Sequence, residues 1–145
     1  MTKIDRAGIA ALIPHAGAMC LLDRVLRWDV NSVRCLTRCH AREDTPLRRP
    51  DGTLGVASGV EIAAQAMALH GRLVADGAGP SINGYLASLR DVRLMQARLD
   101  GIEGDLVIDA ERLMGDAHGA IYRFVLESGG IALLSGRATV LFGAV

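Results

Sequence analysis

The pattern of hydrophobic and polar positions divides the chain into one long apolar segment and several alternating ones. Residues 57–75 are apolar on almost every face, which is typical of a buried helix. Residues 33–39 alternate between Val, Cys or Thr and Arg or Leu, with the two-residue period of a strand. Further strands are predicted at 82–94, 105–114, 120–127 and 131–142. The Gly-Gly pair between the last two predicts a hairpin.

The first third of the chain predicts a short helix, a long strand and a loop. Residues 5–12 can form a helix with Asp5 as its N-cap and Pro14 closing it. Residues 19–30 suit a long, bent strand. Residues 41–53 are polar and contain two prolines, which predicts a loop long enough to suggest a functional role.

This order of elements predicts an α+β fold in a single domain that spans residues 1–145. The apolar face of a sheet must be covered, and a helix that is apolar all round must be enclosed. One long helix lying in the concavity of a curved antiparallel sheet satisfies both requirements, which is the hotdog arrangement. An ordinary two-layer α+β domain would give the same pattern.

Composition and charge argue against several classes of function. The 16 basic and 16 acidic residues balance, so no electrostatic footprint for nucleic acid is present. No apolar run approaches the roughly 20 residues of a membrane span, and the N-terminal stretch does not read as a signal peptide. Three cysteines suggest no disulfide framework. We expect a cytoplasmic protein without nucleic-acid or membrane partners.

Two motifs carry a family resemblance. Ile13-Pro14-His15, followed by Leu21-Leu22-Asp23-Arg24-Val25, resembles the "LPH…LLVDRV" opening of the β-hydroxyacyl carrier-protein dehydratases. Glu61-Ile62-Ala63-Ala64-Gln65 resembles the "E-x-x-A-Q" of their central hotdog helix. The amino-acid sequence of these two segments is most similar to that of the divergent branch associated with aryl-polyene pigment biosynthesis.

The resemblance implies an enzyme that dehydrates 3-hydroxyacyl thioesters on acyl carrier protein to trans-2-enoyl thioesters, in fatty acid or aryl-polyene-type biosynthesis. Its partner would be the carrier with its phosphopantetheine-linked acyl chain, and the chain would form a homodimer. No cofactor or metal is implied, because proton transfers suffice. Two alternatives remain open: a non-catalytic partner subunit or acyl-carrier binding module, and a hotdog thioesterase.

Glu61 is the principal catalytic candidate. Dehydration needs a base, an acid and dipoles for the enolate-like oxygen, and a helix N-terminus supplies free amides. Gly59, Val60, Gln65 and Pro14 are the candidate substrate-binding residues around it. A purely structural alternative is a capping box between Ser58 and Glu61.

The base must be sought elsewhere, because the family's "GHFPG" histidine is replaced here by Leu47. His40 and His15 are the candidates. His40 would act with Glu61 of the partner subunit, or else be an exposed loop histidine. His15 would line the tunnel, or else be a turn histidine bonded to backbone. We expect His70 to be structural.

Two other groups invite a functional reading. Cys35, Cys39 and His40 have the spacing C-x3-C-H, but no second cluster completes a zinc site, so the cysteines are predicted to be buried as small hydrophobes. Arg42, Arg48 and Arg49 precede the long helix, where they would either attract an acidic carrier or belong to a solvated loop.

Overall fold

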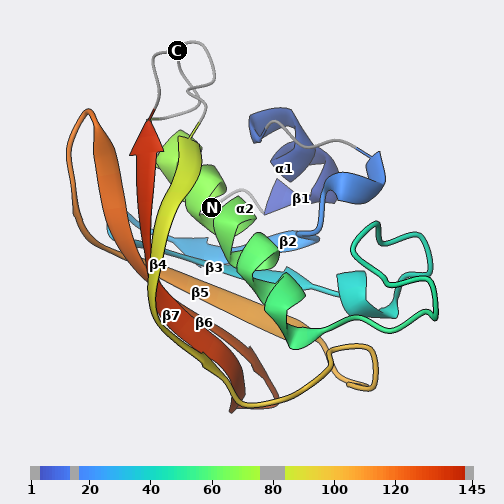
Figure 1. Cartoon of the computed structure of the whole chain (residues 1–145). Coiled ribbons are helices and arrows are strands. Elements are labelled where there is room, and N and C mark those ends of the chain that lie inside the picture. Colours follow the sequence, from blue (N-terminus) through green and yellow to red (C-terminus); the bar gives the residue numbers. More distant parts are fainter. Residues whose placement is uncertain (1–3, 14–16, 76–83, 143–145) are drawn as a thin grey trace.

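The computed structural model describes residues 4–13, 17–75 and 84–142. Helix α2 (Gly59–Val74) lies in the concave face of a curved antiparallel sheet, so the predicted α+β hotdog fold is confirmed (Figure 1). The described residues form seven strands in the order β1-β2-β3-β5-β6-β7-β4. These strands are β1 (Ile4–Asp5), β2 (Arg24–Trp28), β3 (Ser32–Thr37), β4 (Gly84–Leu94), β5 (Leu106–Gly115), β6 (Gly119–Ser128) and β7 (Ile131–Phe142).

Helix α1 (Arg6–Leu12) begins as the sequence predicts. The Asp5 carboxylate accepts a hydrogen bond from the Gly8 amide at 3.0 Å, which makes Asp5 the N-cap. Pro14, which was expected to close this helix, lies outside the described residues.

Helix α2 is largely buried, as its composition predicts, although one side of it is only half-buried. None of its residues is fully exposed, and it packs on β3, β5 and β6. It starts at Gly59, directly after the 3-10 turn η3 (Val56–Ser58). None of the helices in the described ranges combines the length and hydropathy of a membrane span.

The predicted hairpin between β6 and β7 is confirmed. Ser128 pairs with Ile131, and the two residues between them are Gly129 at φ 58° and Gly130 at φ 80°. Two consecutive left-handed residues are what a tight turn between twisted antiparallel strands requires, and glycine adopts them without steric strain.

The prediction of one long strand over residues 19–30 is wrong. A 3-10 turn, η1 (Gly17–Met19), is followed by irregular backbone, and β2 covers only Arg24–Trp28. The physical reason is that side chains satisfy this backbone. Gln65 donates to the Met19 carbonyl and accepts from the Leu21 amide, so these groups need no sheet partner.

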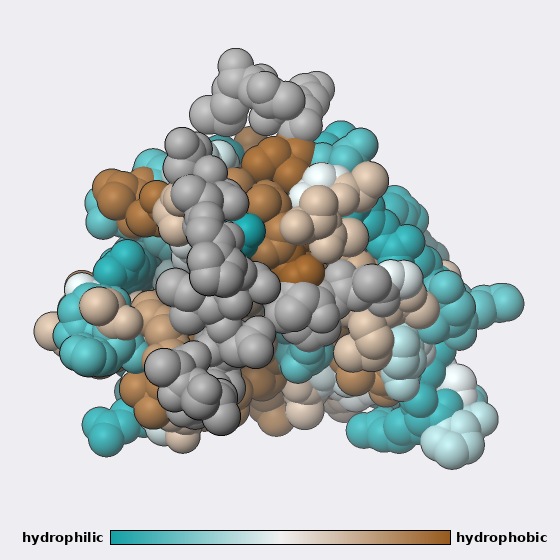
Figure 2. Space-filling view, turned by 90° about the horizontal axis from the view of Figure 1, so that it is seen from above, coloured by the Kyte–Doolittle hydropathy of each residue, from teal (hydrophilic) through white to brown (hydrophobic). Residues whose placement is uncertain are grey.

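Strand β4 lies at the edge of the sheet, and the described residues leave its inner face partly uncovered. Cross-strand register aligns Leu86 with Val140, Leu89 with Ala138 and Leu94 with Leu134, on the concave side. The apolar residues on this side remain exposed: Leu86 37%, Leu89 40%, Val92 38% and Leu94 54%. Seen from above, hydrophobic residues are visible in the middle of the molecule beside the grey segments, and hydrophilic ones dominate one flank (Figure 2).

Candidate active site

Glu61 lies in the first turn of α2, on the side of the helix that is only half-buried. The helix residues with intermediate exposure include Val60, Glu61, Ala64 and Ala68, whereas Ile62, Ala66 and Leu69 are buried against the sheet. The carboxylate therefore sits at the positive end of the helix dipole, next to small side chains. A carboxyl in this position can exchange a proton with a ligand that approaches the half-buried side.

Gln65 holds a neighbouring backbone segment beside Glu61. It is fully buried, its Oε1 accepts from the Leu21 amide at 2.9 Å, and its Nε2 donates to the Met19 carbonyl at 2.7 Å. The same Nε2 lies 3.5 Å from Glu61 Oε1. Gln65 thus links Glu61 to the backbone that joins the two parts of the first sequence motif.

Three further side chains fix this segment, and of these the sequence singles out only Arg42, for a different role. Arg6 Nη2 donates to the carbonyls of Gly17 and Cys20, at 2.8 and 3.1 Å. Arg42 Nη2 donates to Cys20 and Leu21, at 3.3 and 3.2 Å, and Thr37 Oγ1 donates to Leu21 at 2.5 Å. No local sequence signal could have found these contacts, because each joins residues that are distant in the chain.

The capping box between Ser58 and Glu61, which was the structural alternative for Glu61, is absent. Ser58 has helical backbone angles, φ −61° and ψ −19°, and its side chain makes no capping hydrogen bond. The reason is that Ser58 completes the 3-10 turn that precedes α2, whereas a capping residue needs extended backbone. The reciprocal cap therefore does not explain the glutamate at position 61.

Gly59 brings the start of α2 into close contact with the sheet. A Cβ at this position would lie 2.6 Å from Leu134 Cδ2 and 2.8 Å from Leu126 Cδ2. Two leucines, of β6 and β7, therefore occupy the space beside Gly59. Val60 is half-buried and packs against the core. Pro14 and His15 lie outside the described residues.

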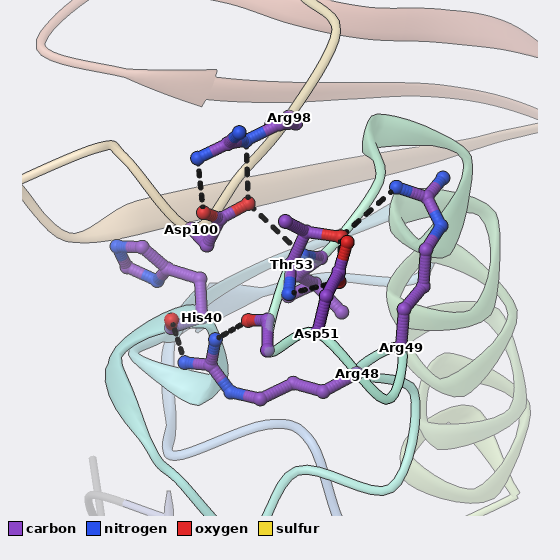
Figure 3. Close-up of polar contacts among 9 residues, drawn as sticks. His40, Arg48, Arg49, Asp51, Thr53, Arg98 and Asp100 are labelled. Carbon is purple, nitrogen blue, oxygen red and sulfur yellow. Dashed lines mark hydrogen bonds and ion pairs between the residues drawn. The ribbon is translucent and has the colours of Figure 1, made fainter.

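His40 is buried, so its interpretation as an exposed loop histidine is wrong. It belongs to the 3-10 turn η2 (Cys39–Ala41), and 1% of its surface is exposed. Its ring points away from α2 (Figure 3). Neither ring nitrogen makes a hydrogen bond of ordinary geometry with the described residues, although the backbone of Ile102 and Gly104 faces it. Burial lowers the pKa of His40.

The loop after His40 is confirmed, and Arg48 stabilises it. Arg48 donates to the carbonyls of His40 and Gly52, at 2.6 and 2.7 Å (Figure 3). It also donates to the Arg42 carbonyl, at 2.9 Å. Arg42 and Arg48 therefore donate hydrogen bonds to backbone carbonyls. Of the three loop arginines, Arg49 is the exposed one.

His70 has a structural role, as expected, and its hydrogen-bond partners lie outside α2. Its Nε2 lies 2.9 Å from the Asp29 carbonyl, and its Nδ1 lies 2.7 Å from the Tyr122 hydroxyl. Because a carbonyl only accepts, Nε2 carries the proton and Nδ1 accepts from Tyr122. Burial lowers the pKa of His70 and raises the pKa of Tyr122 to about 12.

The cysteines are buried, as the sequence predicts. Burial raises the pKa of the Cys35 thiol to about 12 and also raises that of Cys39, which keeps both protonated at neutral pH. Within the described ranges, no three His, Cys, Asp or Glu side chains are grouped to hold a metal ion.

Solved structures share this architecture. The dehydratase heterocomplex ApeI:P from Xenorhabdus doucetiae is 23% identical with a TM-score of 0.81, over 93% of this chain and 90% of that one. Zebra fish thioesterase superfamily member 2 is 18% identical with a TM-score of 0.68, over 95% of both chains. AziG from S. sahachiroi is 14% identical with a TM-score of 0.65, over 90% of this chain and 97% of that one.

No curated protein matches the chain. A family model does: the model described as ApeP-like, ApeP dehydratase, matches residues 7–143. This match covers the two sequence motifs, helix α2 and every strand from β2 to β7. The chain belongs to the ApeP-like dehydratase family.

Proposed function

We propose that this chain acts in the dehydration of 3-hydroxyacyl thioesters on acyl carrier protein, in cytoplasmic fatty acid or aryl-polyene-type biosynthesis. One observation carries the proposal beyond family membership. Glu61 stands at the N-terminal end of α2 on its half-buried side, with no capping box to account for it. Gln65 connects it to the Met19–Leu21 backbone.

The reaction removes a proton from C2, breaks the C3–O bond and releases water as the C2=C3 double bond forms. Glu61 would protonate the leaving hydroxyl, and a histidine would take the C2 proton. Backbone amides at the start of α2 would stabilise negative charge on the thioester oxygen. The leucine contacts at Gly59 hold that end of the helix in place.

His15 is our first choice for the base. It precedes by a few residues the segment that Gln65 ties to Glu61. His40 remains a candidate, but its ring is buried and is directed away from α2, so it would have to move before it could reach a substrate.

A second copy of the chain would bind along β4 and cover its edge and inner face. No other strand among the described residues pairs with the outer edge of this strand, the leucines on its inner face are exposed, and an unpaired apolar edge favours association. A homodimer is the simplest assembly that covers it.

A second candidate function is that of a partner subunit in a mixed assembly. Two observations favour it: ApeI:P is described as a dehydratase heterocomplex, and Leu47 stands here in place of the "GHFPG" histidine of the β-hydroxyacyl carrier-protein dehydratases. In that assembly a different hotdog chain would supply the base or the whole site.

A mass-spectrometric dehydration assay with 3-hydroxyacyl-loaded carrier protein tests the proposal. Wild type, His15→Ala and His40→Ala are compared, each alone and with a candidate hotdog partner. Loss of water with wild type alone supports the enzyme, and the variant that fails identifies the base. Turnover that requires the partner, with both variants active, supports the partner subunit.

A further inference from the structure

Two arginines from different elements donate to the same backbone carbonyl, that of Cys20. Arg6, at the start of α1, reaches it with Nε at 3.3 Å and with Nη2 at 3.1 Å. Arg42, in the loop that follows η2, reaches it with Nη2 at 3.3 Å. In the described part of the chain, neither arginine makes an ion pair. Like charges held this close repel one another, and such unfavourable arrangements are expected at functional sites.

The guanidinium group of Arg42 is used differently from that of Arg48 in the same loop. All three nitrogens of Arg48 donate to carbonyls of the loop and of η2. Arg42 reaches out of the loop with Nη2 alone, to the carbonyls of Cys20 and Leu21. Its Nε and Nη1 are buried and make no hydrogen bond with the described residues. Because unsatisfied buried donors cost free energy, stabilisation of the loop does not account for the charge at position 42.

The Cys20–Leu21 peptide carries the effect of both charges toward Glu61. Its carbonyl accepts from the two arginines, and its N–H group donates to Gln65 Oε1 at 2.9 Å. The Gln65 amide has a fixed orientation, because Oε1 must face this N–H group and Nε2 must face the Met19 carbonyl. Nε2 then lies 3.5 Å from Glu61 Oε1. Hydrogen bonds in series polarise one another, so the arginines strengthen Gln65 as a donor to Glu61.

We call this path, from the two guanidinium groups through the Cys20–Leu21 peptide and Gln65 to Glu61, the hydrogen-bond relay. It distinguishes the two oxygens of Glu61. Since Nε2 of Gln65 is a donor, Oε1 of Glu61 accepts, and in the neutral carboxylic acid the proton is carried by Oε2.

This assignment specifies the proton transfer. Oε2–H of Glu61 gives its proton to the C3 hydroxyl as the C3–O bond breaks, while the base takes the C2 proton and the C2=C3 double bond forms. Glu61 is left as a carboxylate, whose negative charge is stabilised by the Gln65 donor. Water leaves, and the proton held by the base returns to Glu61 before the next turnover.

We propose that Arg42 is a positioning residue for this reaction, which rests on the proposed function, with Glu61 as the acid. Together with Arg6, it polarises the Cys20–Leu21 peptide, which holds Gln65 as the donor to Oε1 of Glu61 and reserves Oε2 for the proton transfer. Arg42 therefore acts through other groups and not on the substrate itself. The reaction needs the positive charge of Arg42, and not only a hydrogen-bond donor at that position.

Turnover of 3-hydroxyacyl-loaded carrier protein by Arg42→Gln and Arg42→Lys, each alone and with the candidate hotdog partner, tests the need for charge. Glutamine keeps a donor and loses the charge, whereas lysine keeps both. We expect Arg42→Gln to lower kcat about tenfold with KM within about twofold of wild type, and Arg42→Lys to keep kcat within about threefold. Arg123→Gln is the control. Arg123 is exposed on β6 and pairs with Glu111, so its replacement should leave kcat and KM at wild-type values.

Urea denaturation of the same variants distinguishes this role from a structural one. If Arg42 only supports the Cys20–Leu21 backbone, both substitutions lower kcat in proportion to their loss in the free energy of unfolding. Equal losses of kcat in the glutamine and lysine variants overturn the proposal, as does wild-type kcat in Arg42→Gln. Should Arg42→Gln fail to fold, Arg6→Gln and Arg6→Lys replace the pair, because Arg6 donates to the same carbonyl. The same difference between glutamine and lysine is expected there, and equal losses again overturn the proposal.

Proton NMR tests the hydrogen-bond relay without catalysis. Loss of charge weakens the polarisation of the peptide, so the Leu21 amide proton and the Gln65 side-chain protons are expected to move upfield in Arg42→Gln. The shift should be larger in the double variant Arg6→Gln/Arg42→Gln and small in Arg42→Lys. Unchanged resonances in the folded double variant overturn the proposal.

The two proposals fail in different ways. Dehydration by wild type, with unchanged kcat in Arg42→Gln, contradicts the role of Arg42 and supports the proposed function. No dehydration by wild type, alone or with the partner, contradicts the proposed function, whereas upfield shifts in Arg42→Gln would still establish the hydrogen-bond relay.

Discussion

Gly59 shows how a single residue fixes the distance between the start of α2 and the sheet. Two leucine methyl groups occupy the space that a side chain would need, at 2.6 and 2.8 Å from the built Cβ. Gly71, further along the same helix, has nothing within 4 Å of its built Cβ. An alanine substitution is therefore expected to have opposite effects on stability at the two positions.

We expect Gly59→Ala to lower the free energy of unfolding by about 1–3 kcal/mol, because the leucines must move within a packed core. Gly71→Ala is the control and is expected to raise it by about 0.5–1 kcal/mol, because alanine favours the helix. Urea denaturation measures both. Equal effects of the two substitutions would contradict this packing at Gly59.

Gln65 is the residue on which the segment beside Glu61 depends. In Gln65→Leu the Leu21 amide and the Met19 carbonyl lose their buried partners. The Leu21 amide is buried whereas the Met19 carbonyl is only partly buried, and leaving one buried polar group unsatisfied costs about 1–3 kcal/mol, so we expect a loss of this size in the free energy of unfolding. Hydrogen exchange at the Leu21 amide is expected to accelerate, and wild-type protection there would refute this role of Gln65.

At the scale of elements, His70 connects three parts of the molecule. It lies on α2, accepts from Tyr122 of β6 and donates to the backbone carbonyl of Asp29, between β2 and β3. The ring must be neutral to make both bonds in this way.

This connection predicts a pH dependence. Burial lowers the pKa of His70 below its ordinary value of 6.5, so the unfolded chain binds the proton more readily than the native one. Stability is therefore full above that value and falls as the pH falls through the lower, folded pKa. Urea titrations between pH 7 and 5 should show a shallower slope for His70→Gln, by at most about 1.4 kcal/mol per pH unit. An unchanged slope would contradict the assignment.

The elements with a local signal could be predicted from the sequence. The all-apolar segment predicts α2, the alternation of side-chain types over residues 33–39 predicts β3, and the Gly-Gly pair predicts the β6–β7 turn. The irregular segment around Leu21 could not be predicted, because its backbone bonds to the side chain of Gln65, far away in the chain. The capping-box pattern at Ser58 was misleading, because this residue belongs to the 3-10 turn that precedes α2.

The candidate site was predicted in part. The second motif singles out Glu61 and Gln65, and the hydrogen bonds of Gln65 link this helical turn to the backbone between the two parts of the first motif. The burial of His40 could not be foreseen, because it arises from the backbone of residues 102–104, which only the fold brings against it.

At the scale of the whole molecule, the uncovered inner face of β4 predicts association. We expect wild type to be at least a dimer by size-exclusion chromatography with light scattering, and Leu89→Lys to be a monomer, because the charge would enter the apolar contact. Ile131→Lys is the control. Ile131 is 65% exposed at the start of β7, so this substitution should leave the assembly intact. A dimeric Leu89→Lys variant would rule out β4 as the interface.

The central claim, that Glu61 takes part in dehydration, is tested most directly by the turnover of 3-hydroxyacyl-loaded carrier protein by Glu61→Gln. The substitution keeps the size of the side chain and removes its proton-transfer function, so we predict a loss in turnover of at least about 100-fold with carrier binding retained. Glu43→Gln, in the exposed loop, is the control and should retain wild-type turnover. Turnover by Glu61→Gln within about twofold of wild type would contradict the account, because the reaction would then not need this carboxyl group.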